Sequence, residues 1–286
     1  MKKFFILASA AIVALASCAK TEVVYKDAPE EIAFKTVNMP MTKAAYNQNL
    51  GVAAFYLDSK EAYFDVTEFS LHNGVWNGNQ YWPLADALTF AVYGPFGGAT
   101  DVDMTATNLA ATAVNGDVDF LYAYIDNAGA GYTKKAFQED GVPVELAHAK
   151  SKVSVHVSTG TNENVTAVEL LETAMTGDCA VTFANNKVEW TNKNSATVDF
   201  TTTTEHFVVP ATPSKLKITY NSVSPAQTGL DVTIDLAGQI MKDKDGNVLT
   251  ETDWQPGYSY TYHININSNQ ITIHAKEAPW IEAENK

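Results

Sequence analysis

The sequence predicts an all-β protein with two β-sandwich domains in tandem. Apolar residues recur at every second position, a period typical of strands with one buried face. Pairs of residues that favour tight turns separate these stretches, and the chain of 286 residues is long enough for two domains. Many short strands between frequent turns favour sandwiches over a parallel α/β sheet.

Five stretches carry the alternation most clearly: Ile32/Phe34, Val153/Val155/Val157, Val232/Ile234/Leu236, Ile264/Ile266 and Ile271/Ile273. The predicted turns are Asn73-Gly74, Asn77-Gly78, Asn115-Gly116, Asp245-Gly246 and Pro256-Gly257. Short helical pieces are expected near 84–89 and 103–114. A polar, glycine-rich stretch at 126–142 precedes a new strand pattern, so the domain boundary is expected near 143.

The first residues have the pattern of an export signal. Lys2 and Lys3 form a positive start, and an apolar run extends from Phe4 to Leu15. That run is shorter than the roughly 20 residues that a membrane-spanning helix needs. We therefore interpret residues 1–17 as a signal peptide that contributes nothing to the fold.

Cys18 ends this segment in the order Leu15-Ala16-Ser17-Cys18, which matches a bacterial lipobox. The pattern predicts that the thiol receives a diacylglycerol and becomes the new N-terminus. Several acyl chains anchor firmly, since each buried methylene contributes about 0.8 kcal/mol. The sequence thus predicts an exported lipoprotein that is anchored to a membrane, with a polar tether over 19–30.

Composition excludes several classes of partner and site. The net charge is −14 and the pI about 4.7, so the chain repels nucleic acid and anionic membrane surfaces. Once Cys18 is acylated, Cys179 is the one free cysteine of the sequence, so an internal disulfide is excluded. Cys179 itself is expected to be a small buried residue. All basic residues are lysines.

No pattern in the sequence predicts an enzyme, a metal site or a cofactor. His148 and His156 have the even spacing of one strand face, but no carboxylate completes a ligand set, so packing is favoured over metal binding. In MKDKDGN (241–247) Gly246 lies too close to Asp243 for a calcium loop, and a hairpin turn is favoured. Five aromatic residues admit either a sandwich core or a sugar-stacking platform, with the core favoured: Trp76, Tyr81, Trp82, Phe90 and Tyr93.

Several phrases together, in order, resemble the Bacteroidetes fimbrillin-like proteins. These phrases are EIAFKTV (31–37), WNGNQYWPLADALTFAVYGP (76–95), DFLYA (119–123), VELAHAKSKVSVHV (144–157), FVVPATPSKLKITY (207–220) and WQPGYSYTYHININSNQITIHAKEAPW (254–280). The resemblance runs from the lipobox to the C-terminus. It implies two transthyretin-like Greek-key sandwiches, over 44–142 and 143–286, lipoprotein export, and assembly into surface fimbriae by strand exchange.

The resemblance also implies that the first strand, within the segment 18–43, is removed by proteolysis. Ile32 and Phe34 share one face of that strand, and Val37 falls out of phase. The matching cleavage position is Lys43–Ala44, where relatives cut by an arginine-specific protease have arginine. A lysine-accepting protease would be needed here, and the mature chain would begin at Ala44.

A strand from another subunit would then fill the vacated groove, because an incomplete sheet exposes unpaired backbone groups and an apolar surface. The candidate donor is the C-terminal stretch with Ile271, Ile273, Trp280 and Ile281. Residues 258–267 are expected to finish the second sandwich, whereas 269–284 could either be donated or stay.

The expected function is therefore that of a structural fimbrial subunit whose partners are other fimbrial subunits, with the outer membrane reached through Cys18. The alternative is an uncut surface adhesin or glycan-binding lipoprotein, such as an anchor or tip subunit, that recognises a host or bacterial surface receptor. An uncut Lys43 would favour this alternative.

Overall fold

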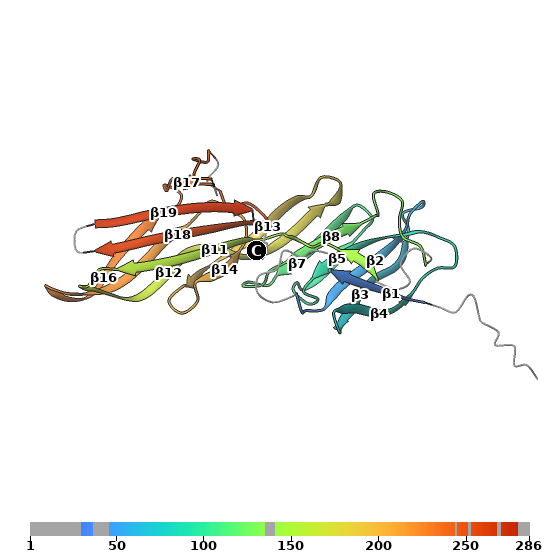
Figure 1. Cartoon of the computed structure of the whole chain (residues 1–286), viewed down its shortest axis with the longest axis horizontal. Coiled ribbons are helices and arrows are strands. Elements are labelled where there is room, and N and C mark those ends of the chain that lie inside the picture. The colour runs from blue at the N-terminus through green and yellow to red at the C-terminus, as the bar shows by residue number, and fades with distance from the viewer. Residues whose placement is uncertain are drawn as a thin grey trace, which may run out of the picture.

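The computed structural model describes residues 30–36, 46–134, 141–243, 245–250, 253–267 and 270–279. These residues form an elongated molecule with two lobes placed end to end (Figure 1). The described part is built from strands, with one short 3-10 helix at Phe183–Asn185 and no α-helix. The prediction of an all-β fold is confirmed. No helix in the described ranges is long and apolar enough to cross a membrane.

The first sheet has eight strands in the order β10-β8-β5-β2-β3-β4-β1-β9. Its members are β1 (Glu31–Thr36), β2 (Leu50–Tyr56), β3 (Ala62–His72), β4 (Val75–Tyr81), β5 (Leu88–Gly94), β8 (Leu121–Ile125), β9 (Val142–Val144) and β10 (Ala147–His148). The sheet folds over on itself, because residues of β1 and β4 share one apolar cluster with residues of β2, β5 and β8. This folded sheet is the main body of the N-terminal lobe.

The second sheet has the order β16-β15-β12-β7-β6, with β13 also paired to β12. Its members are β6 (Asp101–Met104), β7 (Asn108–Val114), β12 (Glu163–Thr182), β13 (Lys187–Asp199), β15 (Lys215–Val223) and β16 (Ala226–Asp235). The third sheet has the order β14-β11-β18-β19-β17. Its members are β11 (Ser151–Thr159), β14 (Glu205–Val208), β17 (Met241–Lys242), β18 (Tyr258–Asn267) and β19 (Gln270–Pro279).

The second sheet is shared by both lobes, because the 20-residue strand β12 runs from one to the other. Its first half pairs with β15 and buries Val168 and Leu170 against the third sheet. Its second half pairs with β7 and buries Cys179 and Val181 against the first sheet. Between the halves, Glu172 has a φ of +52° and the pairing register with β13 shifts.

The predicted boundary at 143 is therefore not where the sheets divide. β9 contains residue 143 and pairs with β1 in the N-terminal lobe. β10 follows it and pairs with β8 in the same lobe. The C-terminal lobe begins with β11, and the β12–β13 hairpin returns to cover the N-terminal lobe. The sequence shows where a polar, glycine-rich stretch gives way to a strand pattern. The backbone pairing, however, decides which lobe each strand joins.

Most of the local predictions hold. The five alternating stretches lie in or continue β1, β11, β16, β18 and β19. Turns occur at Asn73-Gly74 and Pro256-Gly257. Gly116 lies in a turn after β7, and Asp245 and Gly246 in the turn after β17. The aromatic residues chiefly form core, since Trp76, Trp82, Phe90 and Tyr93 are buried and only Tyr81 is exposed.

Two local predictions are wrong. Asn77-Gly78 is not a turn but lies inside β4. The ring of Phe69 packs on the α-carbon of Gly78, where any side chain would collide with it, so the glycine serves close packing. The helical pieces also do not form: 84–87 is a loop, and 103–114 is mostly β6 and β7, which bury Leu109, Ala111 and Val114.

Cys179 is buried on β12, as the sequence predicts. Burial raises the pKa of its thiol to about 12, so the thiol stays protonated at neutral pH. We expect Ellman's reagent to leave Cys179 unmodified in folded protein with Cys18→Ser, and to modify it fully in guanidinium. Labelling of the folded protein at the rate of a free thiol would contradict this burial.

Candidate functional site

The candidate site is the place of β1 inside the first sheet. β1 pairs antiparallel with β4, where Phe34 lies opposite Trp76, and parallel with β9, where Phe34 lies opposite Val142. Strand β1 is thus an internal strand although it stands first in the described chain. Its removal would leave one edge of β4 and one edge of β9 without a backbone partner.

Ile32 and Phe34 carry the apolar side of β1, and both have no exposed surface. The ring of Phe34 makes edge contacts with Phe69 and Phe90, at centroid distances of 5.3 Å and 5.0 Å. It therefore lies in the middle of the core between the two halves of the folded sheet. Ile32 and Phe34 thus share one buried face of β1, and the removal of this strand stays a prediction.

Backbone and polar contacts fix both sides of β1. The backbone N–H of Trp82 donates to the carbonyl oxygen of Glu30 at 2.9 Å, and the N–H of Asn79 donates to Glu31 Oε1 at 2.9 Å. Gly141, with a φ of +77°, brings the start of β9 so near that a β-carbon would lie 3.0 Å from the carbonyl oxygen of Ala33. This close fit holds β1 between its two neighbours.

Chain connectivity makes β1 separable from the rest of the lobe. The structure describes the chain again from Tyr46, whose ring lies 6.2 Å from that of Trp76. The Trp76 indole also donates to the Gln48 carbonyl oxygen at 2.9 Å, so the chain is fixed from this point on. Only residues 37–45 connect β1 to the body, and a cut among them would leave β1 held by non-covalent contacts alone.

Several predicted site residues lie outside the described residues: Cys18, Val37, Lys43, Ala44, Trp280 and Ile281. Their roles in lipidation, processing and strand donation stay predictions. The predicted cleavage position Lys43–Ala44 falls within the connection between β1 and Tyr46.

The candidate donor strand β19 lies in the third sheet. It pairs with β18 over its whole length, and with β17 through Met241↔Ala275 and Lys242↔Lys276. Ile273 packs against the C-terminal core, whereas Ile271 is 36% exposed. β19 is thus a strand of its own lobe, and Ile271, on the same face as Ile273, is the partly exposed one of the two isoleucines.

Outside the β1 site, the histidines occupy separate environments. His148 on β10 contacts Asp119, with Nδ1 2.9 Å from the carboxylate, while His156 lies on β11. The chain leaves the first sheet between them, so the two histidines do not share a strand face. The sequence spacing missed the actual neighbour of His156, which is His263 on the adjacent strand β18; His263 in turn lies opposite His274 on β19.

The turn after β17 uses Asp243 as an internal cap. Its carboxylate accepts hydrogen bonds from the backbone N–H groups of Asp245 and Asn247, at 2.9 Å and 2.8 Å, and from the Asn247 side chain at 2.8 Å. These bonds lower the pKa of Asp243. The turn predicted here is confirmed, and the carboxylate is engaged within it.

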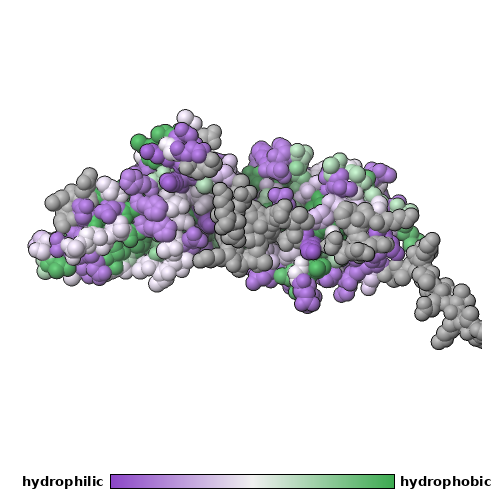
Figure 2. All heavy atoms as spheres, in the orientation of Figure 1, coloured by the Kyte–Doolittle hydropathy of each residue, from purple (hydrophilic) through white to green (hydrophobic). Residues whose placement is uncertain are grey.

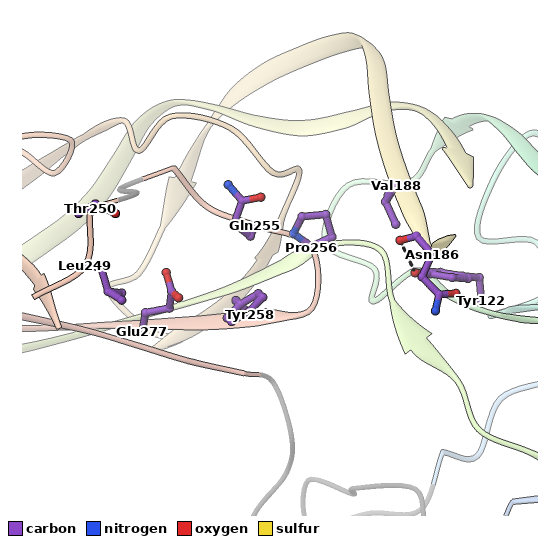
Figure 3. A pocket seen from close by; sticks show the side chains of 9 residues that line it. All are labelled: Tyr122, Asn186, Val188, Leu249, Thr250, Gln255, Pro256, Tyr258 and Glu277. Carbon is purple, nitrogen blue, oxygen red and sulfur yellow. Dashed lines mark hydrogen bonds between the residues drawn. The ribbon is translucent and has the colours of Figure 1, made fainter. Parts of the chain in front are cut away.

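A cavity of about 550 Å³ lies where the lobes meet. Figure 3 shows its lining, in which the hydroxyl of Tyr122 reaches the carbonyl oxygen of Asn186 at 3.5 Å. The lining combines aromatic, amide, hydroxyl and carboxylate groups with three aliphatic side chains: Tyr122, Asn186, Val188, Leu249, Thr250, Gln255, Pro256, Tyr258 and Glu277. Such a lining fits a small polar molecule better than an apolar one.

Many solved structures are similar to this chain, and three of them illustrate the shared fold. An inferred cell adhesion protein from Bacteroides uniformis has a TM-score of 0.62 and 14% identity, over 88% of this chain and 99% of that one. A fimbrial protein from Bacteroides vulgatus has a TM-score of 0.56 and 14% identity, over 87% and 99%. An inferred cell adhesion protein from Bacteroides ovatus has a TM-score of 0.52 and 14% identity, over 90% and 100%.

At such low identity these likenesses concern the fold alone. No curated protein matches the chain. The sequence profile of the fimbrillin-like family matches residues 38–280, which is most of the chain and begins just after β1. The chain belongs to the fimbrillin-like family.

Proposed function

We propose that this protein is a structural fimbrial subunit that reaches the outer membrane as a lipoprotein through Cys18. Proteolytic removal of its N-terminal segment then opens the β1 groove, and a strand from another subunit fills it. The observation that carries the proposal is the position of β1: an internal strand with Ile32 and Phe34 fully buried, joined to the lobe only through residues 37–45. Membership of the fimbrillin-like family and the fimbrial and adhesion names among the similar structures support it.

The physical basis is that β1 keeps the groove closed. While β1 is present, β4 and β9 are paired and the apolar pocket of Phe34 is filled, so no aggregation-prone edge is exposed there. In Figure 2 the visible face is dominated by polar and neutral residues, with apolar residues in scattered patches. Removal of β1 would create a sheet edge and an apolar slot together, which is the requirement for strand addition.

The C-terminal strand β19 has a pattern that fits this slot. Its Ile271 and Ile273 are two residues apart, as Ile32 and Phe34 are, so both pairs place two large apolar side chains on one face of a strand. Since β17 contacts β19 through only two residue pairs, one side of β19 is lightly held. We therefore propose that the β19 region, including Trp280 and Ile281, is donated to the next subunit.

Cleavage after Lys43 is the first test. We expect a lysine-specific protease to produce a chain that begins at Ala44 and then forms ladders of polymers stable in cold detergent. Lys43→Gln should stay monomeric under the same treatment, as judged by N-terminal sequencing and gel electrophoresis. Equal polymerisation of Lys43→Gln, or complete release of the N-terminal segment without polymers, would contradict the proposed role.

A peptide with the sequence of residues 30–36 tests occupation of the groove directly. Added in excess during cleavage, it should refill the β1 position and suppress polymerisation. The same peptide with Phe34→Asp should have no effect, because a carboxylate in the apolar slot carries a large desolvation cost. Equal suppression by both peptides would show that the apolar slot does not select the strand.

The donor assignment predicts a separate effect of Ile271→Asp. Since Ile271 is 36% exposed, the substitution should destabilise the monomer only modestly, by about 1 kcal/mol. Polymerisation should fail, because the side chain would enter the apolar slot of the next subunit. Ile240→Asp, at an apolar position that is 67% exposed, is the matched control and should polymerise normally.

The second candidate is a surface adhesin or glycan-binding lipoprotein that stays uncut, as an anchor or tip subunit. The cavity in Figure 3 favours it, since its tyrosines and amides could hold a sugar. A clean monomer with and without protease, together with oligosaccharide binding lost in Gln255→Ala, would favour this second function.

A further inference from the structure

Three histidines form a row across neighbouring strands of the third sheet. The pairing of β11 with β18 places His156 opposite His263, and the pairing of β18 with β19 places His263 opposite His274. Figure 1 shows these three strands side by side in the C-terminal lobe. Residues opposite each other on adjacent strands have β-carbons about 4.5–5.5 Å apart, so neighbouring imidazoles are within reach of each other.

The histidine row faces solvent. His156, His263 and His274 are all exposed, whereas the residues beside them along the strands, such as Val155 and Tyr262, are buried in the C-terminal core. This alternation is the ordinary result of a sheet with one covered face. An ion or molecule in solution can therefore approach all three rings.

Two of the rings already face each other. The imidazoles of His156 and His263 are stacked, with centroids 5.1 Å apart and an angle of 18° between the ring planes. Two other histidines lie against carboxylates instead: His148 against Asp119 and His206 against Asp117. The pair His156–His263 is thus held together by strand register, not by a carboxylate partner.

We propose that His156 and His263 bind a divalent transition-metal ion of the zinc class, with His274 as a neighbouring imidazole that can replace His156. Imidazole nitrogen is a preferred ligand for zinc, copper and nickel ions. Two histidines occupy half of a tetrahedral coordination shell and leave the other positions to water.

The site requires rotation of the exposed rings and no movement of the backbone. Within the described part of the chain, no three histidine, cysteine or acidic side chains are already grouped around a common metal position. Exposed side chains change rotamer readily, so two stacked imidazoles can turn their nitrogens toward one ion. The sequence predicted no metal site because His156, His263 and His274 are brought together only by strand pairing.

The test is calorimetric titration with zinc chloride of the exported chain without a histidine tag. The chain carries Cys18→Ser, so that the Cys18 thiol does not compete for zinc. One zinc ion should bind per chain. His263→Ala should abolish zinc binding, because His263 belongs to both neighbouring pairs of histidines. His156→Ala should lower the zinc affinity by at least about tenfold, since the loss of even an outer-shell partner of a metal ligand lowers affinity by that factor. His274→Ala should weaken it less.

His72→Ala, at another exposed histidine, is the matched control and should bind zinc as the parent chain does. The ring NMR signals of His156 and His263 should shift with zinc, while those of His148 and His206 should not. Absence of binding to the parent chain, or unchanged affinity in the His156→Ala/His263→Ala double variant, would overturn the proposal. Equal thermal unfolding of all variants is expected, because the substituted positions are exposed.

Discussion

Phe34→Ala is expected to lower the free energy of unfolding of the N-terminal lobe by about 3–5 kcal/mol. The side chain has no exposed surface, and its ring contacts Phe69 and Phe90 edge to face. Alanine would leave a cavity in the centre of the folded sheet, where β2, β4 and β5 cannot collapse without losing their own pairing. The lost stability is the sum of the free energy gained by burying the ring away from water and the free-energy cost of the cavity.

The measurement should follow one lobe at a time, since a protein with two lobes need not unfold in one step. Hydrogen exchange of peptides from β4 and β9 reports on the two neighbours of β1, and peptides from β18 serve as the internal reference. Lys35→Ala is the matched control, because Lys35 lies next to Phe34 on β1 and is exposed. Similar exchange rates in Phe34→Ala and Lys35→Ala would show that β1 contributes little to the lobe.

The same substitution bears on assembly. A weaker hold on β1 should speed its release after cleavage, so cut Phe34→Ala should polymerise faster than the cut parent chain. A slower rate would imply that β1 departure does not limit assembly. Stability and polymerisation rate should therefore move in opposite directions, which a general folding defect would not produce.

The strands with one buried face were predictable because the alternation of apolar and polar residues can be seen within a few neighbouring residues of the sequence. Ile32/Phe34 and Val153/Val155 each reveal their inward face within a few residues, and a period of two determines which side chains face the core. The resemblance to fimbrillin-like proteins implied a removable first strand, but neither it nor the periodicity predicted the internal position of β1 between β4 and β9. Periodicity shows that a strand has an apolar face, but not which strands it pairs with.

The shared second sheet illustrates this limit. Along β12, Leu170 faces the C-terminal core and Cys179 faces the N-terminal one, and the alternation of buried residues changes phase near Glu172, between them. The position where the strand changes lobes is set by its pairing with β7 and β15, which are distant in sequence. The histidine row escaped sequence analysis for the same reason.

Lys150→Met is expected to destabilise the junction of the lobes by about 3–5 kcal/mol, because three carbonyl oxygens lose their hydrogen-bond donor at once. Lys150 is fully buried between β10 and β11. Its ammonium donates to the carbonyl oxygens of Asn115 at 2.7 Å and Met175 at 3.1 Å, and also to that of Gly116. Methionine has a similar length but cannot donate, and each buried acceptor left unpaired costs about 1–3 kcal/mol.

The pH dependence of stability separates the effect of the Lys150 charge from the effect of its packing. Burial lowers the pKa of Lys150 from 10.5 to about 8, against the opposing effect of Asp117 and Asp119. Between these two values the unfolded chain keeps the proton and the folded chain loses it, so stability rises with pH there, by up to about 3 kcal/mol. Below about pH 8 both states are protonated, and Lys150 adds no slope.

The gap in stability between the parent chain and Lys150→Met should therefore be wider at about pH 9.5 than at about pH 7. Denaturant unfolding of both proteins at the two pH values measures it, and the comparison cancels the tyrosines and other lysines that titrate in the same range. Lys187→Met removes a lysine of a solvent-exposed ion pair and should change stability by less than about 1 kcal/mol at both pH values. A large stability difference that is the same at both pH values would show that Lys150 keeps its proton throughout and acts through its hydrogen bonds. A small difference at both pH values would show that the three carbonyl groups find other partners and that Lys150 does not hold the lobes together.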